Sequence, residues 1–220
     1  IDIGWKLAAV LQGWGGPRLL ASYDLERRPV GVRNVRMATS FHGLHSAFGA
    51  EDLAALDRQG AYADGVRSKV GDALVSRLGA EFRTIGLQIG YRYDLSPIVV
   101  DDGSPPVPDD PETYHPSARP GGRAPHVWLG DGRSIVDHFG KGFTLLRLGS
   151  DAPATARLDA AAHARHVPVH TIDVVEAEAC RVYACRLALV RPDGHVAWRG
   201  MEAPADPAAV LDKIRGAGDA

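Results

Sequence analysis

Two cysteines, Cys180 and Cys185, are the residues whose chemistry is easiest to test from spacing alone. A thioredoxin-type redox site needs Cys-x-x-Cys at the start of a helix, where the helix dipole lowers the thiol pKa. Four residues separate this pair, and the turn at Gly149–Ala152, where such a site would fall, has no cysteine. We therefore expect two structural thiols, without a disulfide between them because their Cβ atoms should point apart.

The histidines form two short patterns that could suggest a metal site. His163, His166 and His170 are spaced H-x₂-H-x₃-H, and His42 and His45 flank Gly43 and Leu44. Zinc needs a converging set of ligands, usually completed by cysteine or a carboxylate. His170 lies beyond Pro168 in a predicted strand, so it should not converge with the other two. We predict no metal site.

A basic pair, Arg27 and Arg28, precedes Pro29. Such a pair could contact a cofactor phosphate. It could equally close a helix end and pair with Glu26 or Asp24, and we favour this structural interpretation.

The first hundred residues are predicted to be mainly helical. Helices are expected over 3–13, ending at Gly13, and over 18–28, where Pro29 stops or kinks the helix. Helical character continues over 30–48. A long helix is predicted over 62–82, where apolar residues recur every four positions: Val66, Val70, Leu74, Leu78 and Phe82.

The pattern then changes to alternation. Leu87, Ile89, Tyr91 and Tyr93 alternate with polar or small residues, which predicts a half-buried strand. Residues 104–125 contain seven prolines and are predicted to lack helix and strand. We expect this arm to lie ordered across residues 1–100, with Tyr114 as an anchor, and to separate two domains.

Residues 126–220 alternate between short strands and helices. Strands are predicted at 126–129, 143–148, 169–172, 186–190 and 195–198, with helices at 134–139, 154–166, 176–183 and 207–215. Such alternation indicates a layered α/β unit. A β-α-β half, a β-hairpin and a closing helix make the arrangement thioredoxin-like, and it lacks Cys-x-x-Cys.

Four segments together resemble one family. DIGWKLAAVL (residues 2–11) resembles the NLGWKLAAVL helix of the FAD-dependent aromatic-ring monooxygenases, and YDLERRPV (23–30) resembles their YExERRPV segment. SARPGGRAPH (117–126) and VRPDGHVAWRG (190–200) resemble their C-terminal extension. The order and spacing also agree, so the chain is similar to the phenol-hydroxylase-like and polyketide-hydroxylase-like members. Asp2 stands where that family usually has Asn.

The resemblance implies FAD as cofactor, NADH or NADPH as reductant, and hydroxylation of an aromatic substrate of the polyketide or antibiotic-precursor class. It implies that residues 1–103 are the C-terminal part of an FAD/substrate domain, 104–125 the proline-rich arm, and 126–220 the thioredoxin-like domain. It also implies that Asp2, Ile3 and Gly4, at the start of a helix, lie near the flavin. The alternative for these three residues is a core helix that only packs beneath the FAD domain.

The sequence has no Met at its start and opens in an apolar helical stripe, Ile3, Leu7, Val10 and Leu11. The dinucleotide fingerprint G-x-G-x-x-G does not occur. We therefore expect a C-terminal part of a longer protein, with an N-terminal FAD-binding portion as its missing partner and no activity for this chain alone. The alternative is a non-catalytic dimerisation or interaction module, with a homodimer as its assembly.

Composition narrows the classes of protein to which the chain could belong. The net charge is −2 without a basic tract, which disfavours nucleic acid as a partner. No apolar run approaches 18 residues, so no membrane span is predicted. Two cysteines in 220 residues are compatible with a reducing cytoplasm.

Overall fold

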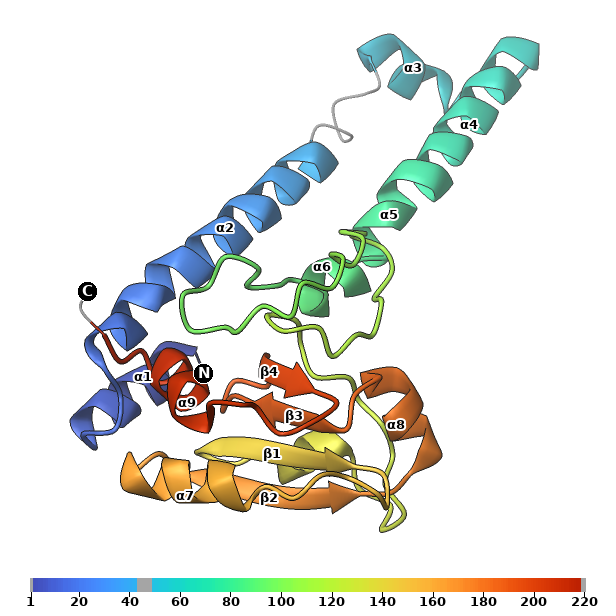
Figure 1. The fold of residues 1–220 in the computed structure, drawn as a ribbon. Coiled ribbons are helices and arrows are strands. Elements are labelled where there is room, and N and C mark those ends of the chain that lie inside the picture. Colours follow the sequence, from blue (N-terminus) through green and yellow to red (C-terminus); the bar gives the residue numbers. More distant parts are fainter. Residues whose placement is uncertain (1, 43–48, 219–220) are drawn as a thin grey trace.

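The computed structural model describes residues 2–42 and 49–218 (Figure 1). Helix α1 (Asp2–Leu11) leads through a glycine-rich turn into α2 (Pro17–His42). Pro29 lies inside α2, so the alternative that this proline stops the helix is wrong. Glu26 and Val30 are buried on either side of Pro29. We attribute the continuity to their packing, which offsets the backbone hydrogen bond that a proline removes.

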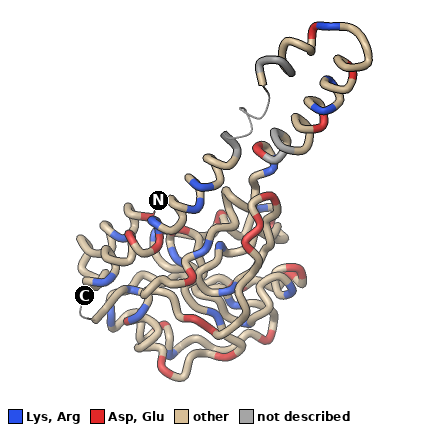
Figure 2. The backbone as a smooth tube through the Cα atoms, turned by 90° about the horizontal axis from the view of Figure 1, so that it is seen from above, with Lys and Arg blue, Asp and Glu red and all other residues tan. Residues whose placement is uncertain are grey.

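The far end of α2 belongs to a helical projection. After α3 (Ala50–Ala55) the chain returns through α4 (Ala61–Ala73), the π-helical η1 (Leu74–Leu78) and α5 (Gly79–Phe82). Both views show these helices extending away from the rest of the chain (Figures 1 and 2). The predicted long helix is therefore present, with one π-helical turn inside it.

The predicted strand over residues 87–93 is wrong. Residues Ile85–Ile89 form a short helix, α6, and the chain beyond it is irregular. A strand needs a neighbouring strand to satisfy its backbone groups, and no strand among the described residues pairs with this segment. Instead Arg33 donates to the carbonyls of Gly86 and Leu87, and the amide of Leu87 donates to Pro111 in the arm.

The arm, residues 104–125, has no helix or regular strand and lies against the helical part. Arg33 of α2 pairs with Asp109 at 2.6 Å, and Arg83 pairs with Glu112 at 2.9 Å. Arg119 pairs with Asp94 at 2.5 Å. These contacts agree with an arm that is docked on residues 1–100.

A four-stranded mixed sheet forms the centre of the C-terminal unit. Its order is β2-β1-β3-β4, from β1 (Phe143–Leu148), β2 (Val169–Val174), β3 (Leu187–Val190) and β4 (Val196–Gly200). β1 and β2 are parallel, whereas β3 is antiparallel to both β1 and β4. Helices α7 (Ala156–Ala164), α8 (Ala177–Tyr183) and α9 (Pro207–Ile214) complete the predicted β-α-β, hairpin and closing-helix order.

The segment before β1 is less regular than predicted. The expected strand at 126–129 is wrong, because only an isolated bridge joins Trp128 to Ser134. The expected helix at 134–139 is present as the 3₁₀ helix η2 (Ile135–His138). Ser134 and Asp137 form a reciprocal capping box that explains where η2 begins.

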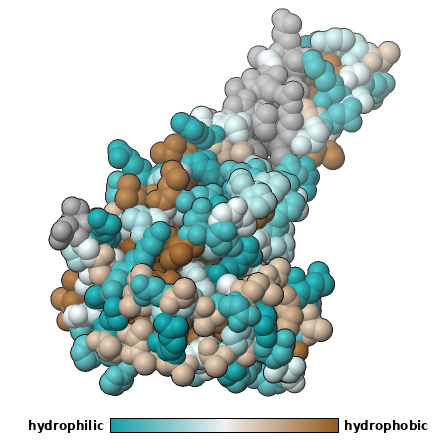
Figure 3. All heavy atoms as spheres, viewed as in Figure 1, coloured by the Kyte–Doolittle hydropathy of each residue, from teal (hydrophilic) through white to brown (hydrophobic). Residues whose placement is uncertain are grey.

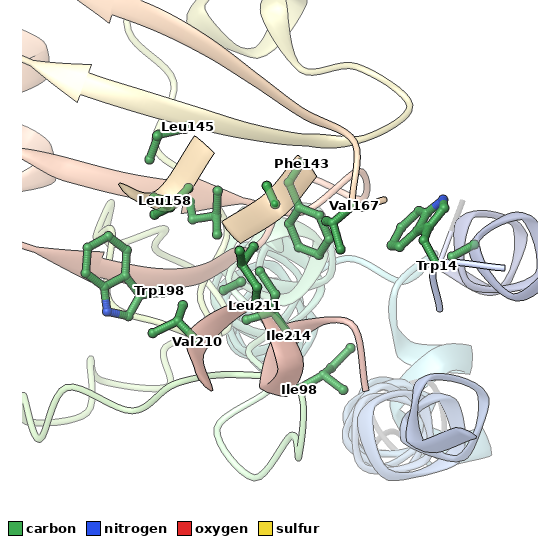
Figure 4. Packing of buried hydrophobic residues seen from close by; sticks show 14 of the residues in the cluster. Trp14, Ile98, Phe143, Leu145, Leu158, Val167, Trp198, Val210, Leu211 and Ile214 are labelled. Atoms are coloured by element: carbon green, nitrogen blue, oxygen red, sulfur yellow. The ribbon is translucent and has the colours of Figure 1, made fainter. Parts of the chain in front are cut away.

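Each face of the sheet has its own hydrophobic core. On one face α8, η2 and the end of the arm cover Leu146, Leu148 and Val190. On the other face α7 and α9 cover Phe143, Leu145 and Leu189, and α1 joins this core through Trp5 and Ala9. Figure 4 shows Trp14, from the turn after α1, beside Phe143 and Val167. The start of the helical part is thus packed into the C-terminal unit.

Within the described residues, no helix is both long enough and apolar enough to cross a membrane.

Candidate functional site

A cluster of buried charges lies where α1, α2 and the β3–β4 turn meet. Its members are two cations and three carboxylates: Lys6, Arg191, Asp2, Glu26 and Asp193. Three separate segments supply them, so only the tertiary fold brings them together. Buried charges of this kind are rare unless they are paired, which makes the cluster the strongest candidate site in the described structure.

Lys6 points from α1 towards α2. Its side chain is fully buried, and Nζ lies 2.5 Å from Glu26 Oε2 and 2.9 Å from Ser22 Oγ. Glu26 also accepts a hydrogen bond from Ser96 Oγ at 2.5 Å. The α1–α2 contact is therefore held by an ion pair in addition to apolar packing.

Arg191 comes from the C-terminal unit and completes the coordination of Glu26. Its guanidinium is fully buried and donates to both carboxylate oxygens of Glu26, at 2.6 and 2.9 Å. It also donates to Asp193 at 2.5 and 3.1 Å. Planar guanidinium groups suit such two-pronged contacts with carboxylates.

The β3–β4 turn orients Asp193 towards this guanidinium. The amide of Arg191 donates to the carbonyl of His195, and Gly194 has a φ of 81°, which a glycine adopts without strain. Trp5 Nε1 of α1 donates to Asp193 Oδ2 at 3.1 Å. The turn thereby contacts the first turns of α1 directly.

Aromatic rings enclose the cluster. The Arg191 guanidinium lies 5.3 Å from the Trp5 ring and 5.1 Å from the Tyr93 ring, within cation–π range. His195 is buried and lies against the Tyr93 ring with a centroid distance of 4.3 Å. These rings exclude water and so strengthen the ion pairs they surround.

Burial and ion pairing shift the pKa values of the three carboxylates in opposite directions. Burial alone would raise the pKa of Glu26 and of Asp193. The Arg191 guanidinium, helped by Lys6 at Glu26 and by His195 at Asp193, more than offsets it, and both pKa values lie below their ordinary range. For Asp2 burial prevails over the attraction of Lys6, and its pKa is raised. The three acids are therefore not equivalent.

Asp2, Glu26 and Asp193 each place one carboxylate oxygen within 4.8 Å of the others, a spacing that could hold a metal ion. Lys6 Nζ and the Arg191 guanidinium already pair with Glu26 and Asp193 at 2.5–2.6 Å and with Asp2 at 3.2 and 3.5 Å. Cations repel one another at such distances. We interpret the group as an ion-pair cluster and not as a metal centre.

The first turn of α1 borders open space. A cavity of about 330 Å³ is lined by Asp2, Ile3, Tyr23, Arg27 and Tyr91. Gly4 borders a separate cavity of about 350 Å³ beside Trp5 and Trp14. Asp2, Ile3 and Gly4, which were predicted to lie near a cofactor, thus all border a cavity.

The other predicted positions have structural roles. Arg27 donates to the Tyr93 hydroxyl and lies 5.1 Å from the Tyr91 ring, and Arg28 faces Asp24 at 3.8 Å on the surface. Glu26 pairs across the fold instead of with its neighbours. Cys180 and Cys185 are both free. The His42–His45 pattern lies outside the described side chains, and the one possible metal-binding group found among the described residues contains no histidine.

Sequence reasoning missed Lys6, Glu26, Arg191, Asp193 and His195 as members of one site. Each lies within a segment that resembles the family, so those segments were the available signal. Nothing in the sequence shows that the ERRPV and RPDGH segments meet.

Comparison with known proteins agrees with these features. Residues 117–218 match the family described as "Aromatic-ring hydroxylase, C-terminal", and residues 1–38 match the family described as "FAD binding domain". The chain is 37% identical over 208 residues to FAD-dependent monooxygenase opdD of Penicillium oxalicum, covering 90% of this chain and 39% of the relative. It is 34% identical over 227 residues to aklavinone 12-hydroxylase RdmE of Streptomyces purpurascens, covering 97% and 37%.

Solved structures give the same result. The chain is similar to RebC-10x, in a structure with K252c bound, with a TM-score of 0.88 and 39% identity, covering 99% of this chain and 41% of that one. It is also similar to the flavin-dependent monooxygenase PieE in complex with FAD and substrate, with a TM-score of 0.78 and 29% identity, covering 98% and 43%. The chain belongs to the FAD-dependent aromatic-ring hydroxylase family. It spans about two fifths of the length of these relatives.

Proposed function

We propose that this chain is part of an FAD-dependent monooxygenase that uses NAD(P)H and hydroxylates an aromatic substrate. The observation that carries the proposal is the similarity to RebC over 99% of the chain. The two family matches, one at each end of the chain, support it independently.

Asp2, Ile3 and Gly4 are the residues we propose to lie near the FAD. When bound, FAD would supply the transfer of electrons from the reductant to oxygen. Ile3 is 39% exposed, and a Cβ added at Gly4 would meet no atom within 4 Å, so the first turn of α1 has room for a large planar group. The backbone amides of a helix start favour negative charge, which suits a reduced flavin. These residues therefore fit the cofactor, with α1 orienting them.

The exposed stripe of α1 supports a larger assembly in the whole protein. Ile3, Leu7 and Leu11 are 39%, 45% and 86% exposed, although the opposite face of α1 is buried. Figure 3 shows hydrophobic residues on the surface near α1 and along α2. We propose that the FAD-binding portion of the protein covers this stripe, because apolar residues that follow one another along one helix face normally mark a packing surface.

An aromatic polyketide or a related antibiotic precursor is the substrate class that we propose. The names of three relatives support this substrate class. RdmE and DnrF are aklavinone 12-hydroxylases of Streptomyces, and RebC is a rebeccamycin biosynthetic enzyme. Phenol 2-monooxygenase of Pseudomonas is also related, so simple phenols form the second class to test.

The test uses the complete protein that contains this chain. We expect it to purify with bound flavin, to oxidise NADH or NADPH faster when an aromatic substrate is added, and to insert one atom from ¹⁸O₂ into the product. Oxidation of the reductant without oxygen insertion into any polyketide or phenol would contradict the hydroxylase proposal. A complete protein without flavin would contradict it at an earlier step.

A further inference from the structure

The buried cluster has an uneven number of charges. Three carboxylates, Asp2, Glu26 and Asp193, face two cations, Lys6 and Arg191. If every group were ionised, the cluster would keep one uncompensated negative charge among side chains that are at most 11% exposed. Such a charge is costly, and a buried acid commonly relieves that cost by binding a proton.

The distances show which carboxylates the cations neutralise. Glu26 lies 2.5 Å from Lys6 Nζ and receives two hydrogen bonds from Arg191 as well as one from Ser96. Asp193 receives two from Arg191, one from the Trp5 indole and one from the amide of His195. Both acids are saturated by donors and are therefore stabilised as anions.

Asp2 is left with the weakest contacts. Its Oδ1 lies 3.2 Å from Lys6 Nζ and 3.5 Å from Arg191, farther than the other two acids. Its Oδ2 is buried and has no hydrogen-bond partner. The side chain is only 11% exposed.

We propose that Asp2 holds the one exchangeable proton of this cluster, and that Glu26 and Asp193 stay ionised as that proton comes and goes. The directions of the three pKa values agree with this assignment, since burial raises that of Asp2 and Arg191 lowers those of the other two. Arg191 and Asp193 of the C-terminal unit thus help to set the charge at the first turn of α1.

Other groups around Asp2 must be considered as holders of the proton. Tyr93 and His195 lie on the cluster side, and Tyr23, Arg27 and Tyr91 line the adjacent cavity. Arg27 cannot lose its proton in a protein, so it is not the group that exchanges one. Burial raises the pKa of Tyr93, so its hydroxyl stays protonated near neutral pH. His195 is the real competitor, because its Nδ1 lies 3.5 Å from Asp193 Oδ1 and both of its ring nitrogens lack a hydrogen-bond partner.

The test is a titration of the 220-residue chain by NMR, with ¹³C in the aspartate and glutamate side-chain carboxyls and ¹⁵N in the histidine rings. Asp2→Asn assigns the Asp2 signal by its disappearance, and Asp2→Ser serves the same purpose if the first variant does not fold. We expect the Asp2 carboxyl to titrate at higher pH than any other acid of the cluster. Asp212 is the matched reference. It is one carboxylate paired with two cations, Arg165 and Arg215, so cations outnumber acids there.

A second measurement follows from linkage. Because the folded pKa of Asp2 is raised, ionisation of Asp2 costs stability as the pH rises through the unfolded and then the folded pKa. Asp2→Asn removes that cost. The measured quantity is the unfolding equilibrium constant of Asp2→Asn divided by that of the native chain. This ratio should fall as the pH rises, in total by about tenfold for each pH unit between the folded and unfolded pKa values of Asp2. The same ratio for Asp212→Asn should rise.

Two results would overturn the proposal. One is an Asp2 carboxyl that stays ionised to a lower pH than Glu26 and Asp193. The other is a cluster proton that resides on the His195 ring while Asp2 remains an anion. Neither measurement requires bound flavin, so failure here is separate from failure of the proposed function.

Discussion

At the scale of single residues, Arg191 has the largest expected effect on stability. It is the fully buried partner of two buried carboxylates that come from different parts of the chain. A pair of this kind adds little compared with apolar packing, but removing one partner leaves uncompensated buried charge. Its value to the protein is therefore in fixing how the C-terminal unit sits on α1 and α2.

We predict that Arg191→Met lowers the free energy of unfolding by about 3–5 kcal/mol, because Glu26 and Asp193 both lose their guanidinium. Arg191→Lys keeps the charge and loses the paired hydrogen bonds, so its loss should be smaller. Urea denaturation measures both. Arg165→Met is the control: its partner Asp212 is part-exposed, and the expected loss is about 0–1 kcal/mol. Equal losses for Arg191→Met and Arg165→Met would contradict the buried-cluster description.

Glu26 provides a prediction with a defined pH dependence. Its folded pKa lies below its ordinary value of 4.5, so its ionised form stabilises the fold above that value, and this contribution is lost as the pH falls through the folded pKa. Glu26→Gln should therefore be less stable than the native chain near neutral pH, and the gap should narrow in acid. Denaturation curves at several pH values test this, and a gap that widens in acid would refute it.

At the scale of elements, the docked arm makes the surroundings of Gly86 different from those of Gly71. A Cβ at Gly86 would lie 1.9 Å from the carbonyl oxygen of Asp110, so α6 and the arm pack backbone to backbone. Gly71 in α4 has no atom within 4 Å of an added Cβ. The two positions make a matched pair of Gly→Ala tests.

We predict that Gly86→Ala displaces the arm and exposes the Arg123–Ala124 bond to trypsin, whereas the native chain resists cleavage there. Gly71→Ala should raise stability by about 0.5–1 kcal/mol, because alanine favours the helix, and should leave the proteolysis rate unchanged. Gel analysis of a limited digest gives both rates. Rapid cleavage of the native chain into two stable halves would show a free tether in place of a docked arm.

At the scale of the whole molecule, the two faces of α1 have different surroundings. One face packs Trp5 and Ala9 into the core of the C-terminal unit, and the other presents Ile3, Leu7 and Leu11 at the surface. A helix with both faces in use transmits its position from one unit to the other. The C-terminal unit can in this way orient the first turn of α1 without containing a catalytic group.

We predict that the purified 220-residue chain binds no stoichiometric flavin and does not oxidise NAD(P)H, because its sequence has no G-x-G-x-x-G loop to hold the dinucleotide. Visible absorbance after purification and an NAD(P)H oxidation assay test the two parts. A yellow chain with flavin bound one to one would contradict the prediction. The complete protein, assayed in parallel, is the positive control.

Local pattern in the sequence determined most of the elements. The helices of residues 1–82 and the alternating strands and helices after 143 follow from apolar spacing and from glycine and proline positions, which act over a few residues. The proline-rich arm could be predicted for the same reason. The strand expected at 87–93 failed because a strand depends on a distant partner, which the local alternation of side chains does not reveal.

The tertiary structure alone decided the candidate site. Glu26 and Arg191 are 165 residues apart in the sequence and share two hydrogen bonds in the fold. Each looked like an ordinary surface charge within its own segment, since a charged residue is buried only when the fold supplies its partner. The chain's composition allowed such a cluster, but only the packing of the β3–β4 turn against α1 and α2 placed two cations among three acids and left Asp2 as the one without a full set of donors.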